Sequence, residues 1–230
     1  MTDTLTAEQL AALRELDTCA VANAIESFDV RLRNEGFNVN VVHCQFPRLS
    51  PLLGYAATLK IRCSSPPPQG HAYPDHNAWW DHILAIPAPR VVVIQDVDPQ
   101  PGTGSFLGEV HAQILLALGC VGVITNGAVR DLPAVEAVGL QLFAGSLAVS
   151  HAYSHIVEVG GPVQIGGLFI QPGDLLHGDQ HGIVSVPHKI AGQIPAAAAR
   201  LSAHEQKIIA VCHGGDFSLE TLRAIIRSTP

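Results

Sequence analysis

Charged residues are scarce in this chain of 230 residues. They make up 14% of the sequence, against 47% for hydrophobic residues, and the formal net charge is −7. So low a charge density leaves apolar surface for other subunits to cover, and we expect an oligomer. The acidic balance and the lack of any Lys/Arg cluster argue against a nucleic-acid partner.

Features of secreted and membrane proteins are also missing. The five cysteines are odd in number and have no C-x-x-C spacing, so we interpret them as reduced thiols. The opening MTDTLTAEQL has neither the basic nor the apolar region of a signal peptide. No apolar run approaches the length of a membrane span. The prediction is a cytoplasmic protein with no membrane partner.

Common catalytic motifs are absent too. There is no G-x-S-x-G, no P-loop, and no complete G-x-G-x-x-G, because Gly102-x-Gly104 lacks the third glycine. Serine-hydrolase and nucleotide-binding functions therefore have no support from motifs.

Helical patterns flank the middle of the chain. A capping-box pattern and an aspartate placed to cap a second helix predict N-terminal helices within residues 6–27. Residues 188–228 are expected to hold one long helix from Lys189 to His213, bent near Pro195, and a final helix capped by Ser218. Between these helices, residues 53–187 are the expected core of a single domain covering 1–230. Residues 28–51 have no clear period and are interpreted as a loop or a subunit-contact arm.

Strand patterns occupy the core. Arg90–Asp96 is a continuous apolar run, which is typical of a strand buried on both faces. Further strands are expected at 55–62, 121–125, 140–143 and 182–187, and Gly166-Gly167 favours a hairpin turn within 164–170. These elements predict a mixed α/β fold with two packed sheet regions.

The stretch from Gly102 to Asp131 holds the strongest candidate site. A glycine-punctuated loop leads into a helix at 108–118, then a strand, so the stretch predicts a right-handed β-α-β unit. Twenty residues separate Glu109 from Arg130, the length of one helix and one strand. We therefore expect Glu109, Arg130 and Asp131 to converge beside the free N–H groups of a helix N-terminus, where a small anion and a metal ion can bind.

Each half of this site has an ordinary alternative. Asp131 can simply cap a following helix, and Arg130 can pair with a neighbouring acid. Glu109 is favourable in any first helical turn, and Gly108 can belong to an ordinary loop.

The twelve histidines include two close pairs, His151 with His155 and His177 with His181. Either pair could ligate zinc, but turn or interface positions are the favoured interpretation.

The sequence GEVHAQILLALGCVGVITNGAVRD, followed by PVQIGGLFIQPGDLLHGDQHGIVSVP, resembles the family of regulator of ribonuclease activity A and the 4-hydroxy-4-methyl-2-oxoglutarate aldolases. The match covers roughly residues 53–187, and the N-terminal helices also fit. The resemblance implies a β/β/α swivelling-domain-like fold, assembled as a homotrimer or a homohexamer. It also implies a divalent-metal-dependent lyase that cleaves small 2-oxo acids to pyruvate or decarboxylates oxaloacetate.

The resemblance assigns a role to each candidate residue. Asp131 would coordinate Mg²⁺ or Mn²⁺ directly, and Glu109 would hold a water bound to the metal. Arg130 would bind the carboxylate and carbonyl end of the substrate. The backbone N–H groups of Val110 and His111 would bind the carboxylate, with Gly108 allowing close approach.

The chain departs from the aldolase motif at two positions. The motif continues Arg-Asp-x-x-Glu/Asp, but the last position here is Ala134, and Glu136 lies two residues beyond it. The metal shell thus loses one carboxylate. In addition, His111 replaces a usually aliphatic residue and adds a titratable group.

Two other functions stay open. A chain that lacks the third carboxylate could be a non-catalytic trimeric regulator that binds a ribonuclease, as the regulator members do. Alternatively, the pocket could serve a hydrolase or another lyase with His111 as the general base.

Overall fold

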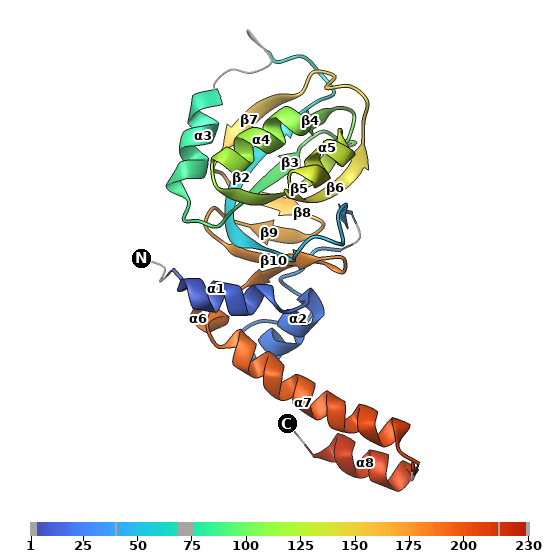
Figure 1. The fold of residues 1–230 in the computed structure, drawn as a ribbon. Helices are drawn as coiled ribbons and strands as arrows, with labels where there is room; N and C mark the ends of the chain where they lie inside the picture. The colour runs from blue at the N-terminus through green and yellow to red at the C-terminus, as the bar shows by residue number, and fades with distance from the viewer. Residues whose placement is uncertain (1–3, 40, 69–75, 216, 229–230) are drawn as a thin grey trace.

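A nine-stranded mixed sheet with surrounding helices forms the body of the protein (Figure 1). The computed structural model describes residues 4–39, 41–68, 76–215 and 217–228. The strand order is β1-β6-β5-β3-β2-β10-β11, with β4 paired to β5 and β7 paired to β2, while β8 and β9 form a separate hairpin. The strands are β1 His43–Cys44, β2 Leu52–Arg62, β3 Arg90–Asp96, β4 Ser105–Leu107, β5 Cys120–Val129, β6 Gln141–Leu147, β7 His155–Val159, β8 Val163–Ile165, β9 Leu168–Ile170, β10 Leu175–Asp179 and β11 Gly182–Val186. The fold is mixed α/β, as expected.

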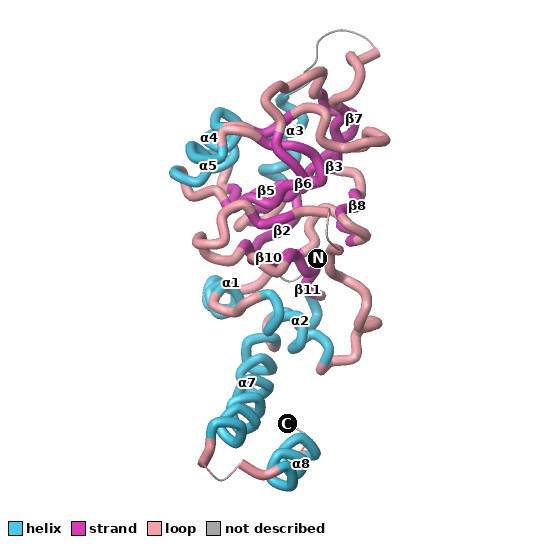
Figure 2. The backbone as a smooth tube through the Cα atoms, turned by 90° about the vertical axis from the view of Figure 1, so that its right-hand side faces the viewer, coloured by secondary structure: helices cyan, strands magenta, loops and turns pink. Residues whose placement is uncertain are grey.

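Helices cover one face of the sheet and extend from one end of it (Figures 1 and 2). They are α1 Ala7–Arg14, α2 Thr18–Glu26, α3 His76–Ala85, α4 Glu109–Ala117, α5 Leu132–Ala137, α6 His188–Ala191, α7 Ile194–His213 and α8 Leu219–Arg227. Helices α1 and α2 lie beside β10 and β11, and α7 runs away from the body with α8 packed along it. No described helix is both long enough and apolar enough to cross a membrane.

The centre of the sheet is parallel, and both of its faces are buried. Strands β3, β5 and β6 pair in parallel, and α4 and α5 are the two crossover helices. Along β3, Val91 and Val93 point into one apolar cluster, whereas Val92 and Ile94 point into another. Because side chains of a strand alternate between faces, this double burial explains the continuous apolar run.

The segment between α2 and β2 connects the two edges of the sheet. Phe37 forms a bridge with Val184 of β11, and β1 pairs with β6 at the opposite edge. Asn38 reinforces the first contact, since its side-chain oxygen accepts a hydrogen bond of 2.6 Å from the Ile183 N–H. The loop expected at 28–51 is therefore held by contacts within its own chain, and the sheet becomes a nearly closed barrel.

Most of the helix caps were predicted correctly from short sequence patterns. The capping box of Thr6 and Gln9 is formed, and Asp17 and Ser218 cap α2 and α8. The β8–β9 turn has positive φ angles at both Gly166 and Gly167, as its hairpin type requires.

Two expectations need correction, and some strands were missed. The bent helix predicted from Lys189 to His213 is two helices, α6 and α7, and Pro195 lies in the first turn of α7, where a missing N–H breaks no hydrogen bond. The strand expected at 121–125 is longer, because β5 continues to Val129 with only a register shift between Thr125 and Ala128. Strands β1, β4 and β10 were not predicted.

A buried histidine joins the N-terminal helices to the sheet. His177 of β10 is fully buried, and its Nδ1 lies 3.0 Å from the Thr18 Oγ1. The Thr18 N–H donates a 2.8 Å hydrogen bond to Asp179. Burial lowers the pKa of His177, although the nearby Asp179 opposes that effect.

This burial predicts acid sensitivity. In the unfolded chain His177 takes up a proton near pH 6.5, whereas the folded protein resists protonation, so the free energy of unfolding should fall as pH decreases below about 6.5. In urea titrations between pH 7 and pH 5, the free energy of unfolding should depend less on pH in His177→Asn than in the wild type. His213→Asn, at the exposed end of α7, is the matched control. Equal slopes in H177N and the wild type would contradict this role.

Candidate active site

The end of β5 meets the start of α4. The Arg130 N–H donates to the Leu107 carbonyl at 3.1 Å, so the residue after β5 is tied to the residue before Gly108. One position further on, the Asp131 Oδ2 accepts a 3.2 Å hydrogen bond from the Glu109 N–H. Glu109, Arg130 and Asp131 are thus brought together, as their spacing predicted.

Asp131 has an unusual backbone conformation. Its φ of 58° and ψ of 34° lie in the left-handed region, which costs a non-glycine residue about 1–3 kcal/mol. It occupies the N-cap position of α5, yet its side chain makes no capping hydrogen bond there. The ordinary alternative of a helix cap therefore accounts for the position of Asp131 but not for its carboxylate, which points to the N-terminus of α4.

Gly108 makes room for this carboxylate. Its φ of −145° is available to any residue, so conformation does not require a glycine. A Cβ atom on Gly108, however, would lie 2.5 Å from the Asp131 Oδ2 and 3.1 Å from the Arg130 Nε. The missing side chain is what allows the carboxylate to approach α4.

Arg130 is half-buried beside Asp131. Its Nε lies 3.4 Å from the Asp131 Oδ2, an ion-pair distance, but is shielded from solvent and has no hydrogen-bond acceptor in the described part of the chain. The Arg130 side chain is nevertheless 33% exposed, and a guanidinium can bind a carboxylate ligand through two hydrogen bonds.

The first turn of α4 presents backbone donors at this point. The Val110 N–H belongs to the turn in which an α-helix provides no internal acceptors. The Val110 side chain is 74% exposed. The His111 ring stacks on Phe106 with centroids 5.0 Å apart, and meets Trp79 edge-on at 5.8 Å. Sequence reasoning missed this aromatic cluster, because Trp79 is distant in the chain from Phe106 and His111.

The donor set suits a hard divalent cation. Asp131 and Glu109 offer only oxygen ligands, and both are exposed. Mg²⁺ commonly uses one or two carboxylates and completes its shell with water and substrate oxygens. Ala134 supplies no third carboxylate; its N–H donates to the Asp131 carbonyl, and Glu136 is exposed further along α5.

A second group of possible ligands lies elsewhere. The ligand atoms of Cys63, Asp96 and Asp98 are within 4.8 Å of one another and buried. Asp98 already accepts hydrogen bonds from two N–H groups and a hydroxyl, and Asp96 accepts from two N–H groups. Burial raises the pKa of Cys63 to about 11, which opposes the thiolate that a metal needs. These residues hold the loop after β3. Among the described residues, neither histidine pair belongs to such a group.

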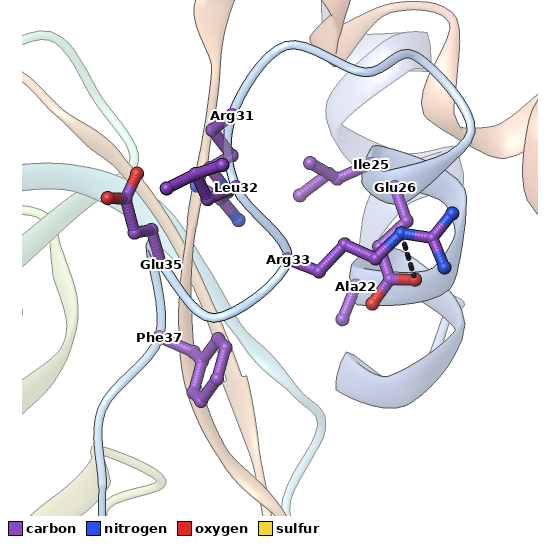
Figure 3. Close-up of a pocket in the computed structure, with 8 residues that line it drawn as sticks. All are labelled: Ala22, Ile25, Glu26, Arg31, Leu32, Arg33, Glu35 and Phe37. Carbon is purple, nitrogen blue, oxygen red and sulfur yellow. Dashed lines mark ion pairs between the residues drawn. The ribbon is translucent and has the colours of Figure 1, made fainter.

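Two hollows differ in their suitability for a ligand. One lies between α2 and residues 31–37, where Arg33 pairs with Glu26 at 3.7 Å (Figure 3). Its volume of about 40 Å³ is too small for a substrate. The other, of about 370 Å³, opens beside Arg130 and Asp131.

The family follows from the sequence match. Residues 18–185 match the model of the RraA-like family, described as Aldolase/RraA. The chain belongs to the RraA-like family. Its expected family and fold are thereby confirmed.

Individual relatives are distant. Over 86 residues the chain is 30% identical to a Halalkalibacterium halodurans protein named "Putative 4-hydroxy-4-methyl-2-oxoglutarate aldolase". The aligned stretch covers 37% of this chain and 41% of that protein. The match thus spans less than half the length of this curated relative.

Two solved structures share the fold. An uncharacterized protein from Pseudomonas syringae pv. tomato has a TM-score of 0.73 at 24% identity, covering 97% of this chain and 96% of that one. Streptomyces coelicolor RraAS2, described as an unusual member of the RNase ES inhibitor RraA protein family, has a TM-score of 0.67 at 21% identity, covering 89% and 96%. At these identities the structures show the fold alone.

The fit of Gly108 against Asp131 can be tested directly. In Gly108→Ala the new methyl group should displace the flexible Asp131 carboxylate rather than the backbone, so the melting temperature should change little while Mn²⁺ affinity falls by about tenfold or more. Gly215→Ala, whose Cβ would meet nothing within 4 Å, is the control. Calorimetric Mn²⁺ titrations of both variants provide the measurement, and wild-type affinity in G108A would contradict the geometry.

Proposed function

We propose that this RraA-like protein is a divalent-metal-dependent lyase that releases pyruvate from small 2-oxo acids. One observation carries the proposal: Asp131 is held in a left-handed conformation with its carboxylate against the N-terminus of α4, beside an arginine whose Nε has no hydrogen-bond acceptor among the described residues. The description of the family, which names both aldolases and RraA, and the aldolase name of one relative support this class of reaction.

Each residue has a proposed task. Asp131 and Glu109 would hold Mg²⁺ or Mn²⁺, which supplies a positive charge that stabilises a developing enolate. Arg130 and the N–H groups of Val110 and His111 would bind and orient the carboxylate of the oxo acid. Such fixed donors can each contribute about 3 kcal/mol to the stability of the transition state.

The bond changes are simple. In an aldol cleavage, the C4 hydroxyl gives up its proton to solvent and the C3–C4 bond breaks. The electron pair of that bond forms the enolate of pyruvate, which takes a proton from water at C3. In oxaloacetate the same C3–C4 bond breaks and C4 leaves as CO₂.

Arg130→Ala and Asp131→Ala should each abolish pyruvate release from oxaloacetate. The first variant lacks the side chain that binds the carboxylate of the substrate, and the second lacks the side chain that holds the metal ion. The measurement is pyruvate formation with Mg²⁺, and again after EDTA, which should also abolish turnover. Arg33→Ala removes a remote arginine and should retain activity. Near wild-type rates in R130A or D131A would overturn the assignment.

The alternative function is a protein-binding regulator. The absence of a carboxylate at Ala134 favours it, and the description of the family names RraA beside the aldolases. A folded protein that binds metal but converts no oxo acid would support this alternative. The homotrimer or homohexamer, the single domain, the cytoplasmic location and the lack of a nucleic-acid partner stay predictions.

A further inference from the structure

The hollow beside Arg130 and Asp131 is apolar. It starts at these two residues and continues along the beginning of α5 and the loop after β6, and its described lining is completed by Val129, Leu132, Pro133, Leu147, Ala148 and Val149. Leu147 is 61% exposed and Val149 is 98% exposed, so both present apolar surface beside the site. A substrate anchored at Arg130 and Asp131 therefore meets aliphatic side chains where it extends from them.

Charge is the second feature of this hollow. Among its described lining residues, only Arg130 and Asp131 carry charges, and they lie 3.4 Å apart from each other. The proposed function uses both of them at the pyruvyl end of the substrate. A second carboxylate, placed further along, would meet aliphatic side chains and no cation among the described lining residues.

We propose that the apolar hollow receives the C4 substituents of the substrate, and that these substituents are uncharged and aliphatic. The inference rests on the proposed function and narrows its substrate class to 4-hydroxy-2-oxo acids whose cleavage yields pyruvate and an aliphatic ketone or aldehyde. Oxaloacetate carries a carboxylate at C4 until the C3–C4 bond breaks, and apolar surroundings that disfavour this charge favour its departure as uncharged CO₂.

A matched pair of substrates tests this class. In 4-hydroxy-4-methyl-2-oxopentanoate a methyl group replaces the C5 carboxylate of 4-hydroxy-4-methyl-2-oxoglutarate. Cleavage of the C3–C4 bond gives pyruvate and acetone from the first, and two molecules of pyruvate from the second. Counted per bond cleaved, kcat/KM should be about tenfold or more higher for the methyl compound. An equal or reversed ratio would overturn the proposal.

Binding separates this inference from the proposed function. The pair 2-oxopentanoate and 2-oxoglutarate lacks the C4 hydroxyl and cannot undergo the cleavage, so competition or calorimetry with Mg²⁺ present reports affinity alone. Tighter binding of 2-oxopentanoate supports the apolar class even in a protein that proves inactive on every oxo acid. Tighter binding of 2-oxoglutarate overturns that class, while turnover of oxaloacetate would still uphold the lyase.

A charge placed in the hollow should reverse the preference. Val149→Arg puts a cation on a highly exposed position and should shift the substrate ratio toward the dicarboxylate by about tenfold. Val30→Arg, at a half-exposed valine after α2, is the matched control and should keep the wild-type ratio. Light scattering should show unchanged assembly in both variants. If V149R instead alters the oligomeric state and leaves the ratio unchanged, a second copy of the chain covers the hollow, and the proposal is wrong.

Discussion

The hydrogen bond from the Glu109 N–H to the Asp131 carboxylate joins the two ends of the central β-α-β unit, and the rest of the site depends on it. It forms because parallel pairing of β3, β4 and β5 brings the end of β5 to the start of α4. It also needs a glycine at position 108, since any Cβ there would occupy the space of the carboxylate. Sheet register and one missing methyl group thus set the geometry of the proposed metal and substrate sites.

The same contact explains why Asp131 tolerates a strained backbone. A left-handed aspartate turns the chain sharply after β5, so that Arg130 and Asp131 reach the helix N-terminus while α5 begins immediately afterwards. Fixed charges and N–H dipoles arranged before a ligand arrives need little reorganisation when charge develops during reaction. The surrounding sheet holds this strain of about 1–3 kcal/mol, a cost of the kind that residues at ligand sites often carry.

Much of this could be predicted from sequence, because the signals are local or periodic. The caps of α1, α2 and α8 and the buried strand at Arg90–Asp96 depend on neighbouring residues or on alternation. The spacing from Glu109 to Arg130 placed both residues at one end of the unit. Contacts between distant segments gave no such signal. The path of residues 28–51 depends on both edges of the sheet, and the packing of His111 depends on Trp79 and Phe106.

Low charge density predicted apolar surface, and two of the exposed apolar surfaces in the structure differ in their setting. Phe37, Val39 and Phe169 are exposed near the contact between residues 34–39 and the β8–β9 hairpin, where nothing catalytic has been identified among the described residues. Leu147 and Val149 are exposed beside Asp131. A subunit contact can account for either surface. A substrate can account only for the surface at Leu147 and Val149, because that surface continues from the residues that would anchor the substrate. Proximity to Arg130 and Asp131 therefore makes the second surface a candidate for specificity, and leaves the first as the simpler candidate for assembly.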